Sequence, residues 1–239
     1  MIRKRIVALT GAGISAPSGL PTYRGVGSDP ALTHPTALAD FEARPEEVWQ
    51  YFGGLRTAAR AAAPNPAHDA LADLGFTHDV TIATQNVDTL HEEAGSRIVH
   101  HLHGNLFRTR CHDPFCALPP ADDHSAPDRP PTCPRCGSLL RPDVVLFGEP
   151  LPRPAKRATD AAVADADLLL VIGTTLAVNT ASTVTRWARD CGVPRVWLTR
   201  DPDPAAYDLF QRVIDADAVE ALPPLLDDVE ALIGQLARR

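Results

Sequence analysis

Short, continuous apolar segments alternate along the chain with longer segments in which apolar residues recur at helical spacing. The continuous type predicts buried strands, because a strand that is covered on both faces needs apolar side chains on both. These segments are Ile6–Leu9, Val80–Ala83, Ile98–Leu102, Val144–Phe147, Leu168–Ile172 and Val196–Leu198. Helical spacing is found over Pro154–Ala166, Ala181–Arg189 and Leu225–Leu236. Strands that alternate with helices predict an α/β fold with a doubly wound parallel sheet.

Two segments interrupt this alternation. Residues 29–76 have helical spacing but contain no convincing strand. Residues 108–142 are rich in Pro, Asp, His and Cys, and their Pro119-Pro120 and Pro130-Pro131 pairs exclude a regular helix. We therefore expect both segments to be insertions that lie outside the main sheet.

Charge and composition narrow the range of functions. The 239 residues include 30 acidic and 23 basic side chains, and the resulting net charge of −7 argues against a general nucleic-acid-binding protein. No segment approaches the roughly 18 apolar residues of a membrane span. The basic start Met1–Arg5 is not followed by a signal-peptide segment of the usual length. We expect a cytoplasmic monomer with neither a membrane nor a nucleic-acid partner.

Four of the five cysteines form two pairs with metal-binding spacing. Cys111 and Cys116 form a C-x4-C pair, and Cys133 and Cys136 form a C-x2-C pair. Two such pairs can surround one zinc ion, which would supply the stability that this apolar-poor segment lacks. Four unrelated free thiols are the alternative. Because four protein ligands leave no open position, we expect the zinc to be structural, whereas the distant Cys191 is expected to be a small buried residue.

The first predicted strand leads directly into a glycine-rich loop, residues 11–25. Gly11 and Gly13 can adopt positive φ and let backbone N–H groups approach a pyrophosphate closely. The loop does not favour a dehydrogenase. The third glycine of G-x-G-x-x-G is replaced by Ala, which that motif allows, but Pro17 and Pro21 interrupt the helix that should begin at once.

Polar side chains also stand at the ends of other predicted strands. Three such segments are Thr84–His91, His101–Asn105 and Gly173–Leu176. Any one of them alone is weak evidence, because Asn and Asp at a strand end are usually turn formers. Ligands of open α/β sheets bind beyond the carboxyl ends of the strands, so together these segments predict one shared dinucleotide site.

Five blocks in order, together with the cysteine pairs, resemble the sirtuins of bacterial type, which are NAD-dependent protein-lysine deacylases. Gly11–Gly25 resembles GAGxSxxSGIPxFRG, Thr84–Gly95 resembles TQNxDxLHxxAG, and His103-Gly104 resembles the catalytic HG. Leu140–Glu149 resembles LRPxVVxFGE, and Gly173–Val178 resembles GTSLxV. The match covers nearly the whole chain.

The resemblance implies a Rossmann-like domain formed by residues 1–28, 77–107 and 143–239. It also implies a smaller domain formed by the helical insertion 29–76 and a zinc-ribbon module, 108–142. NAD would lie between the two domains as a cosubstrate, and an acyl-lysine peptide would enter from the opposite side. The acyl oxygen attacks the ribose carbon that bears nicotinamide, nicotinamide leaves, and the acyl group passes to ADP-ribose. Deacetylation is the expected activity.

The resemblance also assigns residues to the cofactor site. His103 would be the general base, because an imidazole that titrates near neutrality can take a ribose proton. Asn86 would act beside it by binding ribose or an ordered water, Asp88 would hold the nicotinamide carboxamide, Gln85 would position ribose, and Arg24 would pin the loop or a phosphate. The expected cofactor contacts are Gly11, Ala12, Gly13, Ser15, Thr22, Tyr23, Arg24, Gln85, Asn86, Asp88, His103, Gly173, Thr174, Thr175, Thr199 and Ala218. Thr199 stands where the family commonly has Asn.

A second set of residues would meet the peptide and its acyl group. Phe147–Glu149 and Leu176–Val178 would clamp an extended peptide by strand addition. Sirtuins that remove succinyl or malonyl groups carry a Tyr-x-x-Arg pair that aligns here with Phe52 and Leu55, so that pair is missing. Tyr23, which replaces a Phe, and Arg56 stay as candidates for binding an acidic acyl group. The expected substrate contacts are Tyr23, Phe52, Leu55, Arg56, Val145, Phe147, Gly148, Glu149, Leu176 and Val178.

Three alternatives remain open at this point. The first is a desuccinylase or demalonylase with a non-standard acyl pocket. The second is a mono-ADP-ribosyltransferase or NAD glycohydrolase, against which the peptide-clamp segment Val144–Glu149 argues. The third is a zinc-ribbon binding module on an inactive Rossmann scaffold, against which the set of Asn86, Asp88 and His103 argues.

Overall fold

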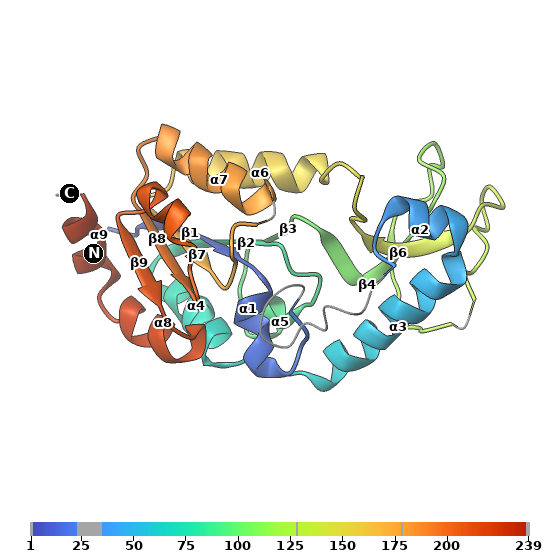
Figure 1. The fold of residues 1–239 in the computed structure, drawn as a ribbon, viewed down its shortest axis with the longest axis horizontal. Helices are drawn as coiled ribbons and strands as arrows, with labels where there is room; N and C mark the ends of the chain where they lie inside the picture. Colours follow the sequence, from blue (N-terminus) through green and yellow to red (C-terminus); the bar gives the residue numbers. More distant parts are fainter. Residues whose placement is uncertain (1, 23–34, 128, 178, 238–239) are drawn as a thin grey trace.

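The computed structural model describes residues 2–22, 35–127, 129–177 and 179–237. Its centre is a six-stranded sheet with the order β3-β2-β1-β7-β8-β9 (Figure 1), and all of its strand pairs are parallel. The strands are β1 (Arg5–Thr10), β2 (Asp79–Thr84), β3 (Val99–His101), β7 (Leu168–Ile172), β8 (Arg195–Thr199) and β9 (Arg212–Asp215). The predicted doubly wound sheet is confirmed.

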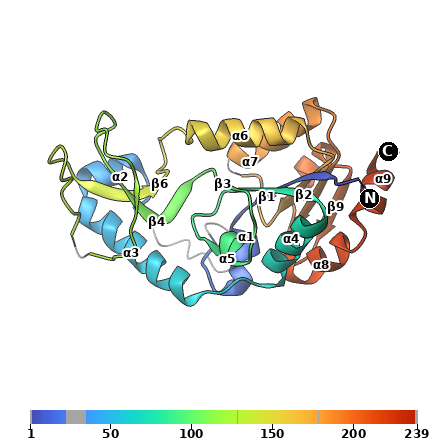
Figure 2. The ribbon, with the colours of Figure 1, turned by 180° about the vertical axis from the view of Figure 1, so that it is seen from behind.

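Helices cover both faces of this sheet, because successive side chains of a strand point to opposite faces. In β1, Ile6 and Ala8 belong to the core on one face, and Val7 and Leu9 belong to the core on the other. The first face is covered by α4 (Pro66–Thr77), α8 (Ala218–Leu226) and α9 (Val229–Leu236). The second is covered by α6 (Arg153–Ala164) and α7 (Asn179–Asp190), as the view from behind in Figure 2 also shows.

A smaller domain lies beside one end of the large one (Figure 1). Its antiparallel sheet has the order β5-β4-β6 and consists of β4 (Gly104–Cys111), β5 (Ala121–Asp122) and β6 (Leu140–Val144). Helices α2 (Leu38–Ala43) and α3 (Pro45–Ala61) pack on this sheet through a separate apolar core. Trp49 of α3 is fully buried there, and its indole N–H donates to the Leu140 carbonyl at 2.9 Å.

Short helical turns follow several strands at the carboxyl edge of the large sheet. These turns are α1 (Ala12–Ser15), η1 (Ala16–Ser18), α5 (Leu90–Glu93) and η2 (Pro204–Leu209). They bring polar backbone groups to the edge at which the site is expected. In the part of the chain that is described, no helix is both long and apolar enough to cross a membrane.

The predicted parallel strand at Val144–Phe147 is wrong. Val144 ends β6, which pairs antiparallel with β4 in the small domain, and Phe147 forms an isolated bridge with Ala37. Val144 and Leu146 are buried against α2 and α3 rather than in the large sheet. An apolar segment shows that a core covers it, but it does not show which core.

Two other predictions also need correction at the level of elements. The single C-terminal helix expected over 225–236 is two helices, because Asp228 begins α9 by accepting a hydrogen bond from the Ala231 N–H. The sequence analysis did not predict α8, because proline disfavours a helix interior and α8 contains Pro223 and Pro224. The strands β4 and β9 were not predicted.

Helix α4 bears on the expected domain boundaries. It lies within the segment 29–76 that was expected to belong to the small domain, yet Ala67, Leu71 and Leu74 pack into the core of the large sheet. The five-segment division stays a prediction, and these contacts favour an end of the helical insertion near residue 65.

Candidate active site

A cavity of about 920 Å³ lies where the carboxyl edge of the large sheet meets the small domain. Most of the described residues that the sequence assigned to cofactor or substrate line it. They are Gly11, Ala12, Gly13, Ser15, Thr22, Phe52, Leu55, Gln85, Asn86, Asp88, His103, Val145, Phe147, Gly148, Glu149, Gly173, Thr174, Thr175, Thr199 and Ala218. The structure therefore brings widely separated segments to one hollow.

The glycine loops at the cavity are in contact with each other. The Gly13 N–H donates to the Gly173 carbonyl at 2.8 Å, and the Gly11 N–H donates to the Ile172 carbonyl at 3.0 Å. A Cβ at either Gly11 or Gly13 would come within 2.8 Å of Gly173. Gly11 has φ −128°, and of the three glycines Gly11, Gly13 and Gly173 only Gly173, with φ +63°, uses the left-handed region. The expectation of positive φ at the first two glycines is thus wrong, because glycine is needed there for close backbone packing.

Asn86 is held by two acceptors, which fixes the direction of its amide. Its Nδ2 donates to the Gly11 carbonyl at 3.2 Å and to Ser15 Oγ at 3.0 Å. Because a carbonyl only accepts, the amide nitrogen must face the loop, and Asn86 Oδ1 is the atom left to accept from a ligand. Asn86 is 8 % exposed and lines the cavity.

Asp88 is a buried carboxyl at the same wall of the cavity. Burial raises its pKa, and hydrogen bonds from the Leu90 backbone N–H and from Ser15 act in the opposite direction. Ser15 therefore contacts Asn86 and Asp88 together, so one hydroxyl connects the two polar groups that the sequence assigned to ribose and nicotinamide.

His103 follows β3 and lines the cavity from the large domain. Its Nε2 lies 3.2 Å from Thr180 Oγ1 in the first turn of α7, and a hydrogen bond joins the ring to the Gln85 backbone carbonyl. Since Nε2 faces Thr180, Nδ1 is the nitrogen that donates to Gln85, and Nε2 is the unprotonated one in the neutral ring. Burial lowers the pKa of His103 from its ordinary value of 6.5, although the bond to Gln85 raises it. At neutral pH, Nε2 can thus accept a proton.

A pair of buried histidines lies behind the glycine-rich loop. His68 Nε2 is 3.5 Å from Ser15 Oγ, a long hydrogen bond, and its Nδ1 accepts the Asn65 backbone N–H at 3.3 Å. His91 Nε2 lies 2.9 Å from Thr10 Oγ1, and the two rings meet edge to face at 4.9 Å. Burial lowers the pKa of His68 to about 4 and that of His91 to about 3, so both rings are neutral at pH 7.

The segment expected to meet the peptide is held by an ion pair. Glu149 accepts two hydrogen bonds from the buried Arg141, at 2.9 and 2.7 Å, and one from Arg110 at 2.9 Å. Glu149 Oε2 also accepts the Leu146 backbone N–H at 2.9 Å, which closes the turn 146–149. These contacts lower the pKa of Glu149 although burial raises it, so the carboxylate stays charged. Glu149 therefore fixes the wall of the cavity from behind.

Arg56 is turned away from the cavity. Its guanidinium donates to three backbone carbonyls, to Thr109 Oγ1 at 3.1 Å and to Asp123 Oδ2 at 3.2 Å, and its side chain is 1 % exposed. The structure thus places Arg56 in the frame of the small domain, where it cannot reach an acyl group. The position expected for it was wrong, because sequence spacing does not reveal the five acceptors around it.

The remaining predicted contacts either face away from the cavity or lie outside the described residues. Leu176 does not line the cavity and packs instead against the core under α7, with φ +60°. Tyr23, Arg24 and Val178 lie outside the described residues. Sequence analysis missed Thr180, the partner of His103, which carried only the weak signal of a hydroxyl residue in the first turn after a glycine loop.

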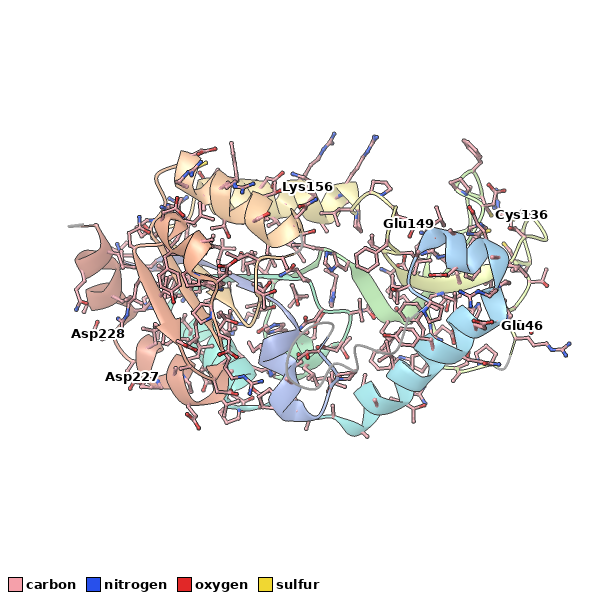
Figure 3. The ribbon with its side chains drawn as sticks, in the orientation of Figure 1. Glu46, Cys136, Glu149, Lys156, Asp227 and Asp228 are labelled. Carbon is pink, nitrogen blue, oxygen red and sulfur yellow. The ribbon has the colours of Figure 1, made fainter. Side chains whose placement is uncertain are left out.

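The four paired cysteines form a metal-binding geometry. Their Sγ atoms all lie within 4.8 Å of one another, with Cys111–Cys136 at 3.5 Å and Cys116–Cys133 at 3.8 Å. Zinc–sulfur bonds of about 2.3 Å in a tetrahedron require sulfur–sulfur distances of about 3.8 Å, so the cluster fits a structural zinc ion. Figure 3 shows Cys136 at the outer end of the small domain, with Glu149 nearer the junction of the domains, so the metal would support the fold of the small domain.

Comparisons with known proteins agree on one family. The family model described as "Sir2 family" matches residues 11–180. NAD-dependent protein deacylase 2 of Pyrobaculum aerophilum is 40 % identical, with 95 % of this chain and 92 % of that protein covered. NAD-dependent protein deacylase 1 of Pseudomonas aeruginosa is 41 % identical, with 93 % of each covered. A solved Sir2 homologue in complex with NAD has a TM-score of 0.85 at 35 % identity, covering 95 % of this chain and 90 % of that one. The chain belongs to the Sir2 family.

Proposed function

We propose that this protein is an NAD-dependent protein-lysine deacylase that transfers the acyl group of lysine to ADP-ribose and releases nicotinamide. One observation supports this most strongly. His103, Asn86 and Asp88 line the same cavity as the glycine loops and the segment Val145–Glu149, so groups for a dinucleotide and for a peptide face one hollow. The relatives named as NAD-dependent protein deacylases, and the related NAD complex, point to the same reaction.

Each of the polar residues at the cavity has a separate role in the reaction, which follows from the chemistry of its side chain. NAD supplies an N-glycosidic bond to nicotinamide that breaks when the acyl oxygen attacks the ribose. His103 Nε2, which is unprotonated at neutral pH, takes the proton of a ribose hydroxyl. Asn86 Oδ1 accepts from ribose or from an ordered water, and its neutral amide does not oppose the positive charge that develops there. Asp88 accepts from the nicotinamide carboxamide.

The first prediction concerns His103. His103→Ala is expected to retain NAD binding but to lower the turnover of an acetyl-lysine peptide by at least ~100-fold, the low end for the loss of a general base. Nicotinamide release with NAD and the peptide is the measurement, and NAD binding is checked by calorimetry. His100→Ala is the matched control, because His100 lies on β3, the strand that His103 follows, but does not line the cavity. Near-normal turnover of His103→Ala would remove this residue from its role.

The same assay separates the alternatives. Nicotinamide release that requires the acyl-peptide supports the deacylase. Release without peptide would indicate a glycohydrolase, transfer of ADP-ribose onto the peptide would indicate an ADP-ribosyltransferase, and no release at all would indicate a binding module.

We further propose that the protein acts as a cytoplasmic monomer. The cavity and the four cysteines come from a single chain, so no second copy is needed to complete either site. Four cysteines gathered in a metal-binding geometry, rather than spaced as a disulfide framework, suit a reducing compartment. Size-exclusion chromatography with light scattering tests the oligomeric state, and a dimer would contradict this part of the proposal.

A further inference from the structure

His101 ends β3 and contacts the segment that carries two of the residues assigned to the cofactor. Its Nδ1 lies 3.3 Å from the backbone carbonyl oxygen of Asn86, and its Nε2 lies 2.6 Å from Oε1 of Glu92 in α5. Asn86 follows β2, and Asp88 lies between it and Glu92 in the sequence. One ring, which is 15 % exposed, therefore connects both ends of this segment.

The two contacts determine the protonation state of the His101 ring. A backbone carbonyl and a carboxylate can only accept hydrogen bonds, so each ring nitrogen must carry a proton to make both contacts. The ring is therefore an imidazolium in this arrangement. A neutral ring has a single N–H, and it would keep the shorter bond to the charged Glu92 and lose the bond to Asn86.

The charges nearest to His101 favour its protonated form. Burial lowers its pKa, but the hydrogen bond and the charge of Glu92, the Asn86 carbonyl and the charge of Asp88 together raise it above the ordinary value of 6.5. The effect on Asp88 is reciprocal. Burial raises the pKa of Asp88, and the charge of His101 acts against this rise, so the imidazolium favours the ionised carboxylate that accepts from a ligand.

The other titratable groups around His101 are histidines that are less basic than it is. Burial lowers the pKa of His91 in α5 and of His100 in β3, and the charge of His101 adds to this lowering in both. Helix α4 contributes His68, whose ring meets His91. Val99 packs into the core under α4, so His101, two residues further along the strand, points to the same face and away from α6.

The contact with His101 completes the set of hydrogen bonds that hold Asn86. The Asn86 amide donates to the Gly11 carbonyl and to Ser15 Oγ, and the Asn86 backbone N–H donates to Thr84 Oγ1 at 3.0 Å. His101 binds the backbone carbonyl of the same residue. Loss of this bond would release the backbone that carries Oδ1, the atom of Asn86 that is left to accept from a ligand.

We infer that His101, with both ring nitrogens protonated, is a positioning residue that holds Asn86 in place for the reaction, and that turnover falls once the pH is high enough to remove one of these protons. This inference rests on the proposed deacylase function and adds a residue to it. His101 acts through Asn86 and does not line the cavity.

Two histidines then impose opposite requirements on the pH. His103 must be unprotonated to accept the ribose proton, and burial lowers its pKa below 6.5. His101 must be protonated, and its pKa is raised above 6.5. Turnover should therefore rise with pH as His103 loses its proton and fall again as His101 loses its own, which gives a bell-shaped profile.

The first part of the test compares two substitutions of His101 by kcat between pH 5 and pH 9, with NAD and an acetyl-lysine peptide at saturation. Asn can place an amide N–H close to the position of Nδ1, whereas Gln can replace only Nε2. His101→Gln is expected to lower kcat at pH 7 by up to roughly tenfold, the cost of the lost bond to Asn86. His101→Asn is expected to recover most of this loss and to lack the fall of kcat at high pH.

The second part changes the charge beside the ring. Glu92→Gln keeps an acceptor for Nε2 but removes the negative charge, so the fall of kcat is expected to move to lower pH. Glu93→Gln is the matched control, because Glu93 lies on the same helix but accepts from Thr89 Oγ1 at 2.7 Å. An NMR titration of the His101 ring without substrate, assigned by its loss in His101→Gln, should show the same shift in Glu92→Gln.

The outcomes distinguish this inference from the function on which it rests. No turnover of the peptide by the wild type at any pH would overturn the function, whereas a His101 ring that loses its proton below pH 6.5 in the NMR titration would overturn the inference with or without activity. Equal kcat in the Asn and Gln variants, or a fall at high pH that does not move in Glu92→Gln, would show that the ring has only a packing role. Thermal unfolding of each variant confirms that it is folded.

Discussion

At the scale of single residues, His68 gives the hydrogen bonds around Ser15 a direction. The ring is neutral at pH 7, and its Nδ1 accepts the Asn65 backbone N–H, so Nε2 carries the proton and donates to Ser15 Oγ. Ser15 Oγ also accepts from Asn86, which leaves its own hydrogen to donate to Asp88. One buried tautomer therefore orients both polar groups that we assign to the cofactor.

This series of hydrogen bonds predicts unequal effects on activity for two substitutions of His68. Gln can place an amide N–H close to the position of Nε2, whereas Asn can replace only Nδ1. His68→Asn is expected to lower kcat by up to roughly tenfold, the cost of one misdirected hydrogen bond, and His68→Gln is expected to stay within about threefold of the wild type. Steady-state kinetics with a thermal melt of each variant is the measurement. If both variants lose equal activity and stability, His68 has only a packing role.

At the scale of elements, the zinc module shows how a segment without an apolar core can be ordered. The described part of 108–142 contains the short strand β5, the second half of β4 and most of β6, and it exposes Phe115 almost completely. The cysteine cluster connects the turn after β4 with the turn before β6. Since β6 leads directly into Val145–Glu149, order in this module reaches the wall of the cavity.

Metal removal is therefore expected to abolish activity through the fold of the small domain. Cys116→Ser, or treatment with a strong chelator, should reduce bound zinc from about one ion per chain, because a structural zinc supplies on the order of 10 kcal/mol of folding free energy. Metal analysis and the thermal midpoint are the readouts. Cys191→Ser is the control, since Cys191 packs against the core under α7 in the large domain. Full activity in a zinc-free protein would show that the cluster does not stabilise the site.

At the scale of the whole molecule, the cavity is assembled where two separate cores meet. The large sheet contributes the ends of β1, β2, β3, β7 and β8, and the small domain contributes α3 and the end of β6. His68 in the first turn of α4 contacts Ser15 after β1, and His91 of α5 contacts Thr10 at the end of β1, so the charge state of this buried pair bears on the stability of the whole fold.

Because His68 and His91 are buried as neutral rings, we expect the folded state to lose stability at acid pH within a defined pH range. Both folded-state pKa values are depressed, so the stability is fully present above the unfolded value of about 6.5 and is lost as the pH falls toward about 4 for His68 and about 3 for His91. At pH 5 each of the two buried rings should lower the free energy of unfolding by about 2 kcal/mol. Urea unfolding at pH 7 and pH 5 measures this loss. His91→Gln should reduce the loss by about 2 kcal/mol, whereas the exposed His124→Gln should not, and an equal loss in all three proteins would contradict the assignment.

The order of elements and the chemistry of the site were readable from sequence because both depend on local patterns. Continuous apolar segments predicted five of the parallel strands, polar residues at strand ends predicted the shared crevice, and paired cysteines predicted the metal cluster. Each of these signals is carried by neighbouring residues, and the resemblance to sirtuins added their roles.

Tertiary structure decided everything that depends on which distant groups meet. The sequence by itself could not show that Val144–Phe147 joins the small domain. Nor could it show that the Arg56 guanidinium donates its hydrogen bonds to backbone carbonyls of β4, or that His68 contacts Ser15. Burial and hydrogen-bond partners are properties of the folded chain, and a step of one residue along a helix, a rotation of about 100°, is enough to exchange a cavity-lining side chain for a structural one. Leu55 and Arg56 are adjacent in sequence, yet only Leu55 faces the cavity.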